Sequence, residues 1–317
     1  MTLKVSLDLG TNTCLMLIAE VGDGGEVLRT LSDHSTIVRL GQGVDQNRRL
    51  HPEARKRTLD CLKQYAQILR EQGLEPGAAV CVATSQARDA EDGAEFFSEI
   101  EREIGFHFKT LSGDEEAKFT FLGGLLPSMD ASHAVVMDIG GGSTELMAQA
   151  SSDKFLGGKF LGGSLDMGAV RFTERFLKSD PVLDSEFWAC QDAIDAELEK
   201  QKPWRAGLRT PHLVAVAGTA TTLAQWQIQQ PLFNADAINE VVLTRGDVHR
   251  QVEELKWRSV AERSLLPGVT KGRADVLLAG AMIFWRVMEV LDFYEARIST
   301  RGLRYGVMGA QNVGTPF

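Results

Sequence analysis

Three consecutive glycines stand between two strand-like apolar runs, in the segment Asp138-Ile139-Gly140-Gly141-Gly142-Ser143-Thr144-Glu145. Glycines in such a place cost conformational entropy and leave nothing to pack, so the pattern predicts a turn that another group approaches closely. An oxyanion fits, because backbone N–H groups and the Ser143 hydroxyl can hold phosphate oxygens, while Asp138 and Glu145 offer oxygen ligands for Mg²⁺. A glycine-rich hairpin without a ligand is the alternative, since the spacing matches neither common nucleotide-binding fingerprint.

A second segment near the N-terminus repeats this pattern. Asp8-Leu9-Gly10-Thr11-Asn12-Thr13 also ends an alternating strand, places a glycine two residues after an aspartate, and continues with small polar residues. The two segments lie 130 residues apart, and both internal duplication and a chance match explain so short a likeness. Two such hairpins that face each other across a domain cleft would grip a phosphate chain from both sides.

Two further strand ends carry groups suited to anions. In Ala215–Leu223, Gly218 and Thr219 lie where a strand runs into a helix, and a helix N-terminus favours negative charge. Simple N-capping by Thr219 is the alternative. Arg88 follows another short strand, and either forks onto a phosphate or forms a surface ion pair with Asp89 or Glu91.

The segment Ser112-Gly113-Asp114-Glu115-Glu116-Ala117 predicts the start of a helix. Ser112 and Glu115 form a capping box, and acidic residues are common in a first helical turn. Glu116 is not needed for that box. A carboxylate near anion-binding turns is where a general base would position water for attack on phosphorus.

The alternation of strands and helices predicts an α/β layered fold, and 317 residues correspond to roughly two domains. A polar loop at residues 127–132 marks the expected boundary. Strands are expected at 3–8, 15–21, 26–31, 79–83, 106–110 and 134–137. Helices are expected at 52–72, 93–104, 114–123, 168–177, 184–200, 244–257 and 273–291.

The net charge of −9 and the pI near 5.3 argue against nucleic acid or an anionic membrane as a partner of the whole molecule. The first twenty residues do not form a secretory signal, so a cytoplasmic location is expected. One dense basic run stands out, namely Arg48, Arg49, Arg55, Lys56 and Arg57, with Arg39 upstream. It is either a solvated face or a local attractor for a polyanion. The four cysteines lack metal-ligand spacing and are expected to be reduced and mostly buried.

Taken in order, these segments resemble the exopolyphosphatase and guanosine pentaphosphate phosphohydrolase (Ppx/GppA) family, which belongs to the superfamily of actin, sugar kinases and heat-shock ATPases. The matching stretches cover nearly the whole chain: 8–13, 40–43, 83–88, 112–117, 138–146, 164–171, 215–223, 266–268, 273–275 and 302–304. The resemblance implies two ribonuclease-H-like (actin-like ATPase) α/β domains that flank an active-site cleft. These would be residues 1–126, completed by about 300–317, and residues 127–299.

The resemblance also implies hydrolysis of a terminal phosphoanhydride with Mg²⁺ or another divalent cation. Glu116 matches the position of the base that activates water, and Asp138 and Glu145 match acidic positions tied to metal and catalysis. Asp8 is the third expected metal ligand. The expected phosphate contacts are Asp8, Gly10, Thr11, Asn12, Thr13, Arg88, Gly140, Gly141, Gly142, Ser143, Gly218 and Thr219.

Two departures from the family pattern bear on the expected substrate. Tyr305 stands where the family commonly has Glu, and the chain ends at Phe317, whereas longer members continue into helical domains. The expected function is an exopolyphosphatase that releases phosphate from inorganic polyphosphate. The alternatives are a guanosine pentaphosphate (pppGpp) 5′-phosphohydrolase, a sensor that binds guanosine tetra- or pentaphosphate with little turnover, and a kinase of the same superfamily. A homodimer is common in the family and is expected here.

Overall fold

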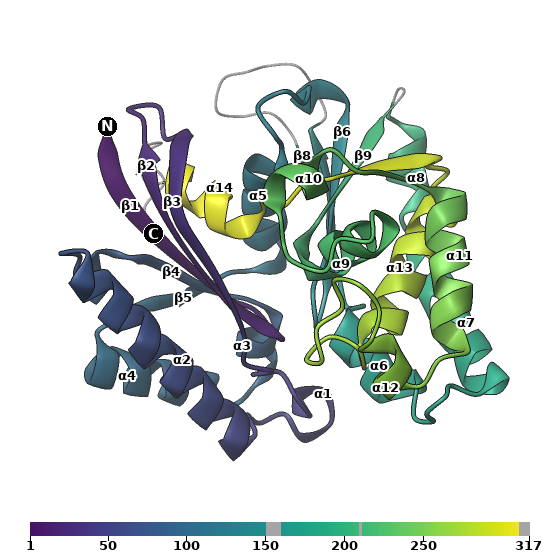
Figure 1. Ribbon diagram of the computed structural model, residues 1–317, viewed down its shortest axis with the longest axis horizontal. Helices are drawn as coiled ribbons and strands as arrows, with labels where there is room; N and C mark the ends of the chain where they lie inside the picture. The colour runs from purple at the N-terminus through teal and green to yellow at the C-terminus, as the bar shows by residue number, and fades with distance from the viewer. Residues whose placement is uncertain (150–159, 209–210, 311–317) are drawn as a thin grey trace. The chain divides into compact units, whose positions relative to one another are not determined.

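The computed structural model describes residues 1–149, 160–208 and 211–310, and the chain divides into two compact units. Unit 1 contains Met1–Gly123 and the segment that begins at Leu303, and unit 2 contains Gly124–Gly302. Each unit is built on one mixed sheet with helices packed against it (Figure 1). The predicted α/β class is therefore confirmed.

The sheet of unit 1 has the order β3-β2-β1-β4-β5. Strands β1 (Thr2–Leu9), β2 (Thr13–Val21) and β3 (Val27–Ile37) form an antiparallel meander, and β4 (Val80–Ala83) and β5 (Phe108–Thr110) continue it in parallel. The expected strand at 26–31 is six residues too short at its C-terminal end, because β3 stays paired with β2 as far as the Thr13–Ile37 partners.

Helices cover both faces of this sheet, as the alternation along β2 requires (Figure 1). Met16 and Ile18 belong to the core beneath α2 (Pro52–Glu71) and α4 (Gly93–Ile104), whereas Leu17 and Ala19 pack with Met308 of α14 (Leu303–Ala310). Helix α5 (Gly113–Gly124) packs on that second face through Phe119. Because Leu7 and Leu9 of β1 face α2, the strand period places Asp8 on the face of α5 and α14.

The sheet of unit 2 has the order β10-β11-β9-β6-β7-β8. Strands β6 (Ala134–Ile139), β7 (Thr144–Gln149) and β8 (Phe160–Leu165) form the meander, β9 (His212–Val216) and β11 (Glu295–Ile298) continue in parallel, and β10 (Val242–Thr244) pairs antiparallel at the edge. Without β10, the strand order repeats that of unit 1. The likeness between the two hairpin segments thus extends to the sheets that carry them.

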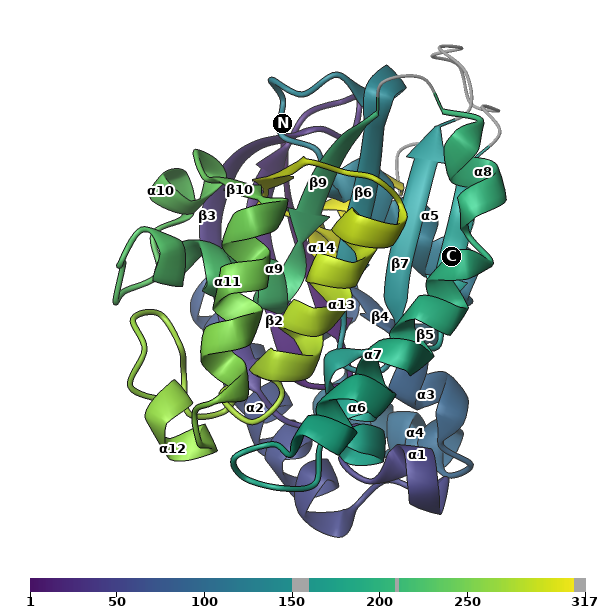
Figure 2. The same cartoon turned by 90° about the vertical axis from the view of Figure 1, so that its right-hand side faces the viewer.

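The core of unit 2 gathers around α13 (Leu277–Val290), whose residues are mostly apolar and buried. Figure 2 shows α13 between α11 (Arg245–Lys256) and α7 (Asp184–Glu199), and α6 (Ala169–Phe176) and α9 (Ala217–Gln227) also contact it. The expected helix at 273–291 is wrong at its start, because residues 273–276 form turns. The remaining short helices are α1 (Val44–Asn47), α3 (Ser85–Asp89), α8 (Lys202–Ala206), α10 (Ala235–Asn239), α12 (Val260–Arg263), η1 (Pro76–Ala78) and η2 (Ala131–His133).

Two other observations concern the cysteines and the length of the helices. All four cysteines are buried and unbridged, as predicted from their spacing. None of the helices in the described ranges is long and apolar enough to cross a lipid bilayer.

Gly306 makes a testable contribution to the packing of α14. A Cβ at this position would lie 1.9 Å from the backbone oxygen of Phe119 in α5, so Gly306→Ala forces the two helices apart. We expect a loss of about 1–3 kcal/mol in the free energy of unfolding, measured by urea denaturation. Gly302→Ala is the control, because its Cβ would meet only a Val216 methyl at 3.9 Å. Equal stability of the two variants would contradict the packing described for α14.

Candidate functional site

The first hairpin of the expected site connects β1 to β2. The Gly10 N–H donates to the Thr13 carbonyl oxygen at 2.9 Å and closes the turn. The side chain of Thr11 contacts Ser85 Oγ at 3.2 Å and Gln86 Oε1 at 3.1 Å, and Gln86 Nε2 donates to the Leu9 carbonyl at 2.7 Å. The hairpin is therefore tied to the N-terminal end of α3.

The segment 38–41 seals the other side of this hairpin. Val38 and Arg39 donate their N–H groups to the Asn12 carbonyl, and the Gly41 N–H donates to the Thr11 carbonyl at 2.8 Å. A Cβ on Gly41 would lie 2.2 Å from Thr11 Cγ2, so only glycine allows this approach. The carbonyl oxygens of Thr11 and Asn12 thus accept hydrogen bonds from this segment. The N–H groups of the same two residues have no acceptor among the described residues.

Asn12 points to the same conclusion through its side chain. The residue is buried, and its Oδ1 has no hydrogen-bond partner in the described part of the chain. Buried polar atoms are nearly always paired, so an unpaired one beside two unused backbone N–H groups indicates a place for a polar ligand.

Glu116 lies in the first turn of α5 and is buried. Arg88 of α3 donates from Nη1 to Glu116 Oε2 at 2.7 Å and to the Leu111 carbonyl at 2.8 Å. Burial raises the pKa of Glu116, and Arg88 opposes that rise. The expected surface pair of Arg88 with Asp89 or Glu91 is wrong, because Arg88 pairs with Glu116 and Asp89 pairs with Arg48.

The capping box beside Glu116 is confirmed. The Ser112 N–H donates to Glu115 Oε2 at 2.9 Å, and the Glu115 N–H donates to Ser112 Oγ at 3.2 Å. Glu115 takes part in the cap and is partly exposed, whereas Glu116 is buried. The two neighbouring carboxylates therefore have separate environments.

Asp8 is close enough to Glu116 for the two carboxyl groups to repel each other. The pKa of Asp8 is raised from 3.8 to about 7, mainly by desolvation and also by the negative charge of Glu116, while the positive charge of Arg304 opposes the rise. Arg304 of α14 is held by a two-pronged contact with Asp33, with Nε to Oδ1 at 3.0 Å and Nη2 to Oδ2 at 2.7 Å. Three carboxyl groups, those of Asp8, Asp33 and Glu116, thus interact with Arg88 and Arg304 within unit 1.

The second hairpin, between β6 and β7, has the same closure as the first. The Gly140 N–H donates to the Ser143 carbonyl at 3.0 Å. Helix α6 uses the hairpin carbonyls: the Ala169 N–H donates to Gly140, and the Arg171 N–H to Gly141. The N–H groups of Gly141, Gly142 and Ser143 have no acceptor among the described residues.

Asp138 and Glu145 stand next to this hairpin as direct cross-strand partners. Opposed residues on an antiparallel pair have Cβ atoms about 4.5–5.5 Å apart, so both carboxylates project from one face of the sheet. Glu145 is buried and accepts a hydrogen bond from Ser164 Oγ at 2.6 Å. No group of three His, Cys, Asp or Glu side chains in the described ranges is placed to hold a metal ion.

These donors fit one kind of metal site. Mg²⁺ commonly binds through one or two carboxylates and completes its shell with water and substrate phosphates. The Asp138–Glu145 pair meets that requirement, whereas a complete protein cage would need more ligands.

Gly218 lies in the first turn of α9, directly beneath the Arg273 guanidinium. A Cβ on Gly218 would lie 1.2 Å from Arg273 Nη1, so a larger residue there would displace the end of the Arg273 side chain. N-capping by Thr219 is wrong, because Val216 occupies the cap position and provides no side-chain hydrogen bond. Ala217 has a positive φ of 66°, a strained conformation that often marks functional turns.

The sequence-based site list missed Arg273 and Arg304. Both stand in stretches that match the family, yet nothing in a single sequence shows that Arg273 lies over Gly218 or that Arg304 faces Asp8. Tyr305, which replaces the common Glu, directs its hydroxyl to Thr30 Oγ1 at 3.1 Å. It therefore helps dock α14 onto β3.

Comparison with known proteins assigns the chain to a family. Residues 17–311 match the Ppx/GppA phosphatase family, so the chain belongs to it, as the sequence motifs predicted. Exopolyphosphatase 2 of Mycobacterium tuberculosis is 34% identical over 299 residues, which cover 89% of each chain. A bifunctional 3-dehydroquinate synthase/phosphatase of Fusobacterium nucleatum is 30% identical over 92% of this chain, but the match spans only 43% of that relative.

Other relatives agree with this assignment. A guanosine-5′-triphosphate,3′-diphosphate pyrophosphatase of Aeromonas salmonicida is 29% identical over 97% of this chain and 60% of its own length. The crystal structure of the Aquifex aeolicus Ppx/GppA family member matches with a TM-score of 0.75 at 28% identity, covering 98% of each chain.

The raised pKa of Asp8 gives a testable dependence of stability on pH. Between about pH 4 and pH 7, Asp8 is deprotonated in the unfolded state but still protonated in the folded state. The free energy of unfolding of the wild type therefore falls by up to roughly 4 kcal/mol as the pH rises through this range. Asp8→Asn should therefore match the wild type near pH 4 and exceed its stability near pH 8. Urea unfolding in EDTA measures this.

Asp23→Asn, which removes a fully exposed carboxylate, is the matched control and should follow the wild type at both pH values. An Asp8→Asn variant that is no more stable than the wild type near pH 8 would show that Asp8 carries no desolvation cost.

Proposed function

We propose that this protein is an exopolyphosphatase that hydrolyses the terminal phosphoanhydride of inorganic polyphosphate and releases phosphate. The observation that carries the proposal is the pair of identically closed hairpins, each with unused backbone N–H groups beside a carboxylate. Membership of a phosphatase family and the likeness to exopolyphosphatase 2 of Mycobacterium tuberculosis support it.

The hairpins would bind phosphate oxygens through main-chain N–H groups. Thr11 and Asn12 provide them in unit 1, and Gly141, Gly142 and Ser143 provide them in unit 2. Donors fixed in place before the reaction stabilise charge that develops on the transferred phosphoryl group without any cost of rearrangement. Arg273, which lies over Gly218, adds a positive charge in unit 2.

Glu116 would orient and deprotonate the attacking water. Burial makes its carboxylate a stronger base, and the hydrogen bond from Arg88 keeps the ionised form accessible. The Arg88 guanidinium has further donors with which to contact a substrate phosphate. In-line attack by water on the terminal phosphorus then breaks the bridging P–O bond, and the shortened chain leaves with the electron pair of that bond.

A divalent cation, with Mg²⁺ as the expected ion, would be held by Asp138 and Glu145, and the expectation that Asp8 is a third ligand stays a prediction. When bound, it supplies positive charge that neutralises phosphate oxygens in the transition state. Glu145 is kept in position by Ser164, so the pair is oriented in advance.

Hydrolysis of pppGpp is the second candidate. It is favoured by the Aeromonas salmonicida relative, whose name gives that activity. Both substrates end in a phosphoanhydride, so the same residues would act on either. The expected homodimer and the low-turnover alarmone sensor stay predictions.

Glu116→Gln tests the proposed mechanism. Removal of a general base typically lowers the rate by about 10² to 10⁴, equivalent to roughly 3–5 kcal/mol of transition-state stabilisation. Phosphate release from polyphosphate and from pppGpp should fall by this factor in the variant. The ratio of the two wild-type kcat/KM values ranks the candidate substrates.

Glu115→Gln is the matched control, because it changes the adjacent carboxylate of the same helix and weakens only the cap and the partly exposed ion pair with Lys109. It should retain activity within about threefold. If Glu116→Gln also stays within threefold of wild type, Glu116 is not the base. Tight alarmone binding by a wild-type protein that releases no phosphate would instead identify a sensor.

A further inference from the structure

A cavity of about 920 Å³ opens in unit 1 beside the N-terminal half of α2. Helix α4 and the segment 42–51 complete its walls. The lining residues are Gln42, Asn47, Arg49, Leu50, His51, Pro52, Arg55, Lys56, Leu59, Asp60, Lys63, Asp92 and Glu99. It contains three cationic side chains of the basic run, Arg49, Arg55 and Lys56, together with Lys63, and the proposed catalytic residues do not line it.

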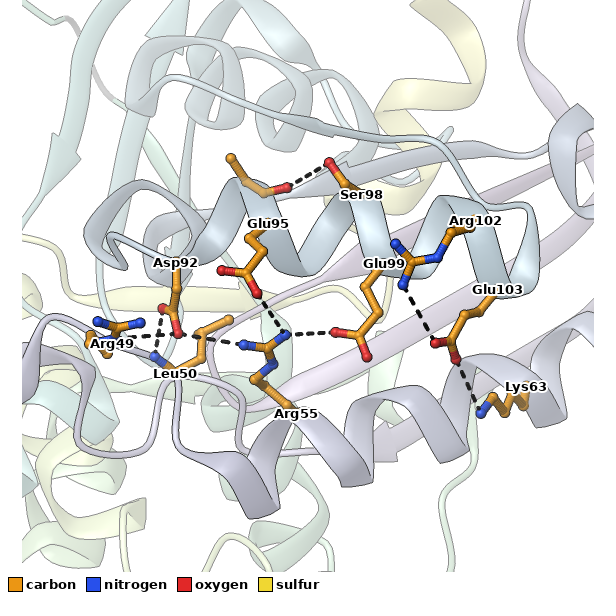
Figure 3. Close-up of polar contacts among 11 residues, drawn as sticks. Arg49, Leu50, Arg55, Lys63, Asp92, Glu95, Ser98, Glu99, Arg102 and Glu103 are labelled. Atoms are coloured by element: carbon orange, nitrogen blue, oxygen red, sulfur yellow. Dashed lines mark hydrogen bonds and ion pairs between the residues drawn. The ribbon is translucent and has the colours of Figure 1, made fainter.

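One of these cations is already neutralised by its neighbours. Arg55 contacts Glu99 at 2.6 Å, Asp92 at 3.7 Å and Glu95 at 3.9 Å (Figure 3). Its guanidinium also lies over the Phe96 ring. Asp92 also accepts the Leu50 N–H at 2.9 Å. The charges of Asp92 and Glu99 are thus largely balanced by Arg55, and their contacts with Arg55 join α2 to α4.

Three other cations are only weakly engaged. Arg49 is 67% exposed and lies 3.8 Å from Asp92, and Lys63 is 55% exposed and lies 3.6 Å from Glu103. Lys56 is exposed and has no ion-pair partner in the described part of the chain. Such exposed pairs contribute little, so these three charges are available to an anion.

The spacing of these cations suits an extended anion. Lys56 and Lys63 are seven residues apart on α2, which is roughly 10.5 Å along the helix, and Asp60 lies between them on the same face. Asp60 is the one carboxylate of the lining without a cationic partner among the described residues, and it opposes anion binding. Removal of the Asp60 charge should therefore strengthen anion binding, whereas removal of a lysine charge should weaken it.

The cavity adjoins the first hairpin. Gln42 lines the cavity, and its neighbour Gly41 donates its N–H to the Thr11 carbonyl at 2.8 Å. Arg57 holds Gln42 in place, donating from Nη2 to Gln42 Oε1 at 3.1 Å. Residues 41 and 42 therefore connect the hairpin to the cavity wall.

We propose that this cavity binds the distal phosphates of a long inorganic polyphosphate chain whose terminal phosphoryl group occupies the Thr11–Asn12 turn. This inference rests on the proposed function and adds a chain-length preference to it. Polyphosphate fits better than a nucleic acid, because His51 is the sole aromatic ring in the lining and binding of single strands relies on aromatic stacking.

The test compares substrates of different length in the triple variant Arg49→Ala, Lys56→Ala, Lys63→Ala. For long-chain polyphosphate at low salt we expect KM to rise about tenfold, because three phosphate contacts are lost. For tripolyphosphate, which is too short to span both places, kcat and KM should stay within about twofold. The salt dependence of KM for the long chain should weaken as well.

Two further variants make the result specific. Lys200→Ala, Lys202→Ala removes exposed cations of unit 2 and should leave every constant unchanged within about twofold. Asp60→Asn should change binding in the opposite direction, lowering KM for the long chain about two- to threefold.

Direct binding separates this inference from the proposed function. Fluorescence anisotropy with labelled long-chain polyphosphate is measured in the Glu116→Gln background, with and without the triple variant. Weaker binding in the triple variant supports the cavity even if the enzyme proves inactive on polyphosphate. Equal binding overturns the inference, and so does equally effective competition by an RNA homopolymer, which would show a general polyanion surface.

Discussion

The structure depends on one backbone constraint, which occurs twice. A strand ends on a carboxylate, a glycine two residues later closes a four-residue turn with its own N–H, and the next strand returns antiparallel. Neighbouring segments then take up the turn carbonyls, through residues 38–41 in unit 1 and α6 in unit 2. The turn N–H groups that remain point to an anionic ligand, because backbone donors are rarely left unpaired when buried.

The charges of unit 1 form a balanced set around this turn. Glu116 and Asp8 repel each other, Arg88 compensates the first, and Arg304, held by Asp33, compensates the second. Burial acts against both carboxylates and raises both pKa values. Buried carboxyl groups whose pKa values are raised in this way are the ones that catalysis by proton transfer uses.

Much of this arrangement is predictable from local sequence. The hairpin glycines, the Ser112–Glu115 capping box and the helix at Gly93–Ile104 each have short-range signals, and the structure has them as predicted. The contacts that were missed are long-range. The Arg88–Glu116 pair joins residues 28 positions apart, Arg304 and Asp33 are 271 apart, and Arg273 reaches back over Gly218. Such contacts depend on the order of the strands in each sheet, and the spacing of apolar residues along the sequence does not predict that order.

The basic run shows the same limit of prediction from local sequence. Its members are equivalent in sequence, yet Arg55 is bound by acids of α4 and Lys56 beside it has no described ion-pair partner. Only the packing of α4 against α2 separates a structural cation from one that is free to bind an anion.

The central claim is that water attacks the terminal phosphorus of a phosphoanhydride chain. The most direct measurement is single-turnover hydrolysis of polyphosphate in oxygen-18-labelled water with Mg²⁺, followed by mass spectrometry of both products. Attack at the terminal phosphorus predicts one labelled oxygen in each released phosphate and none in the shortened chain. Label in the remaining chain, or phosphate release that requires an organic acceptor, would contradict it.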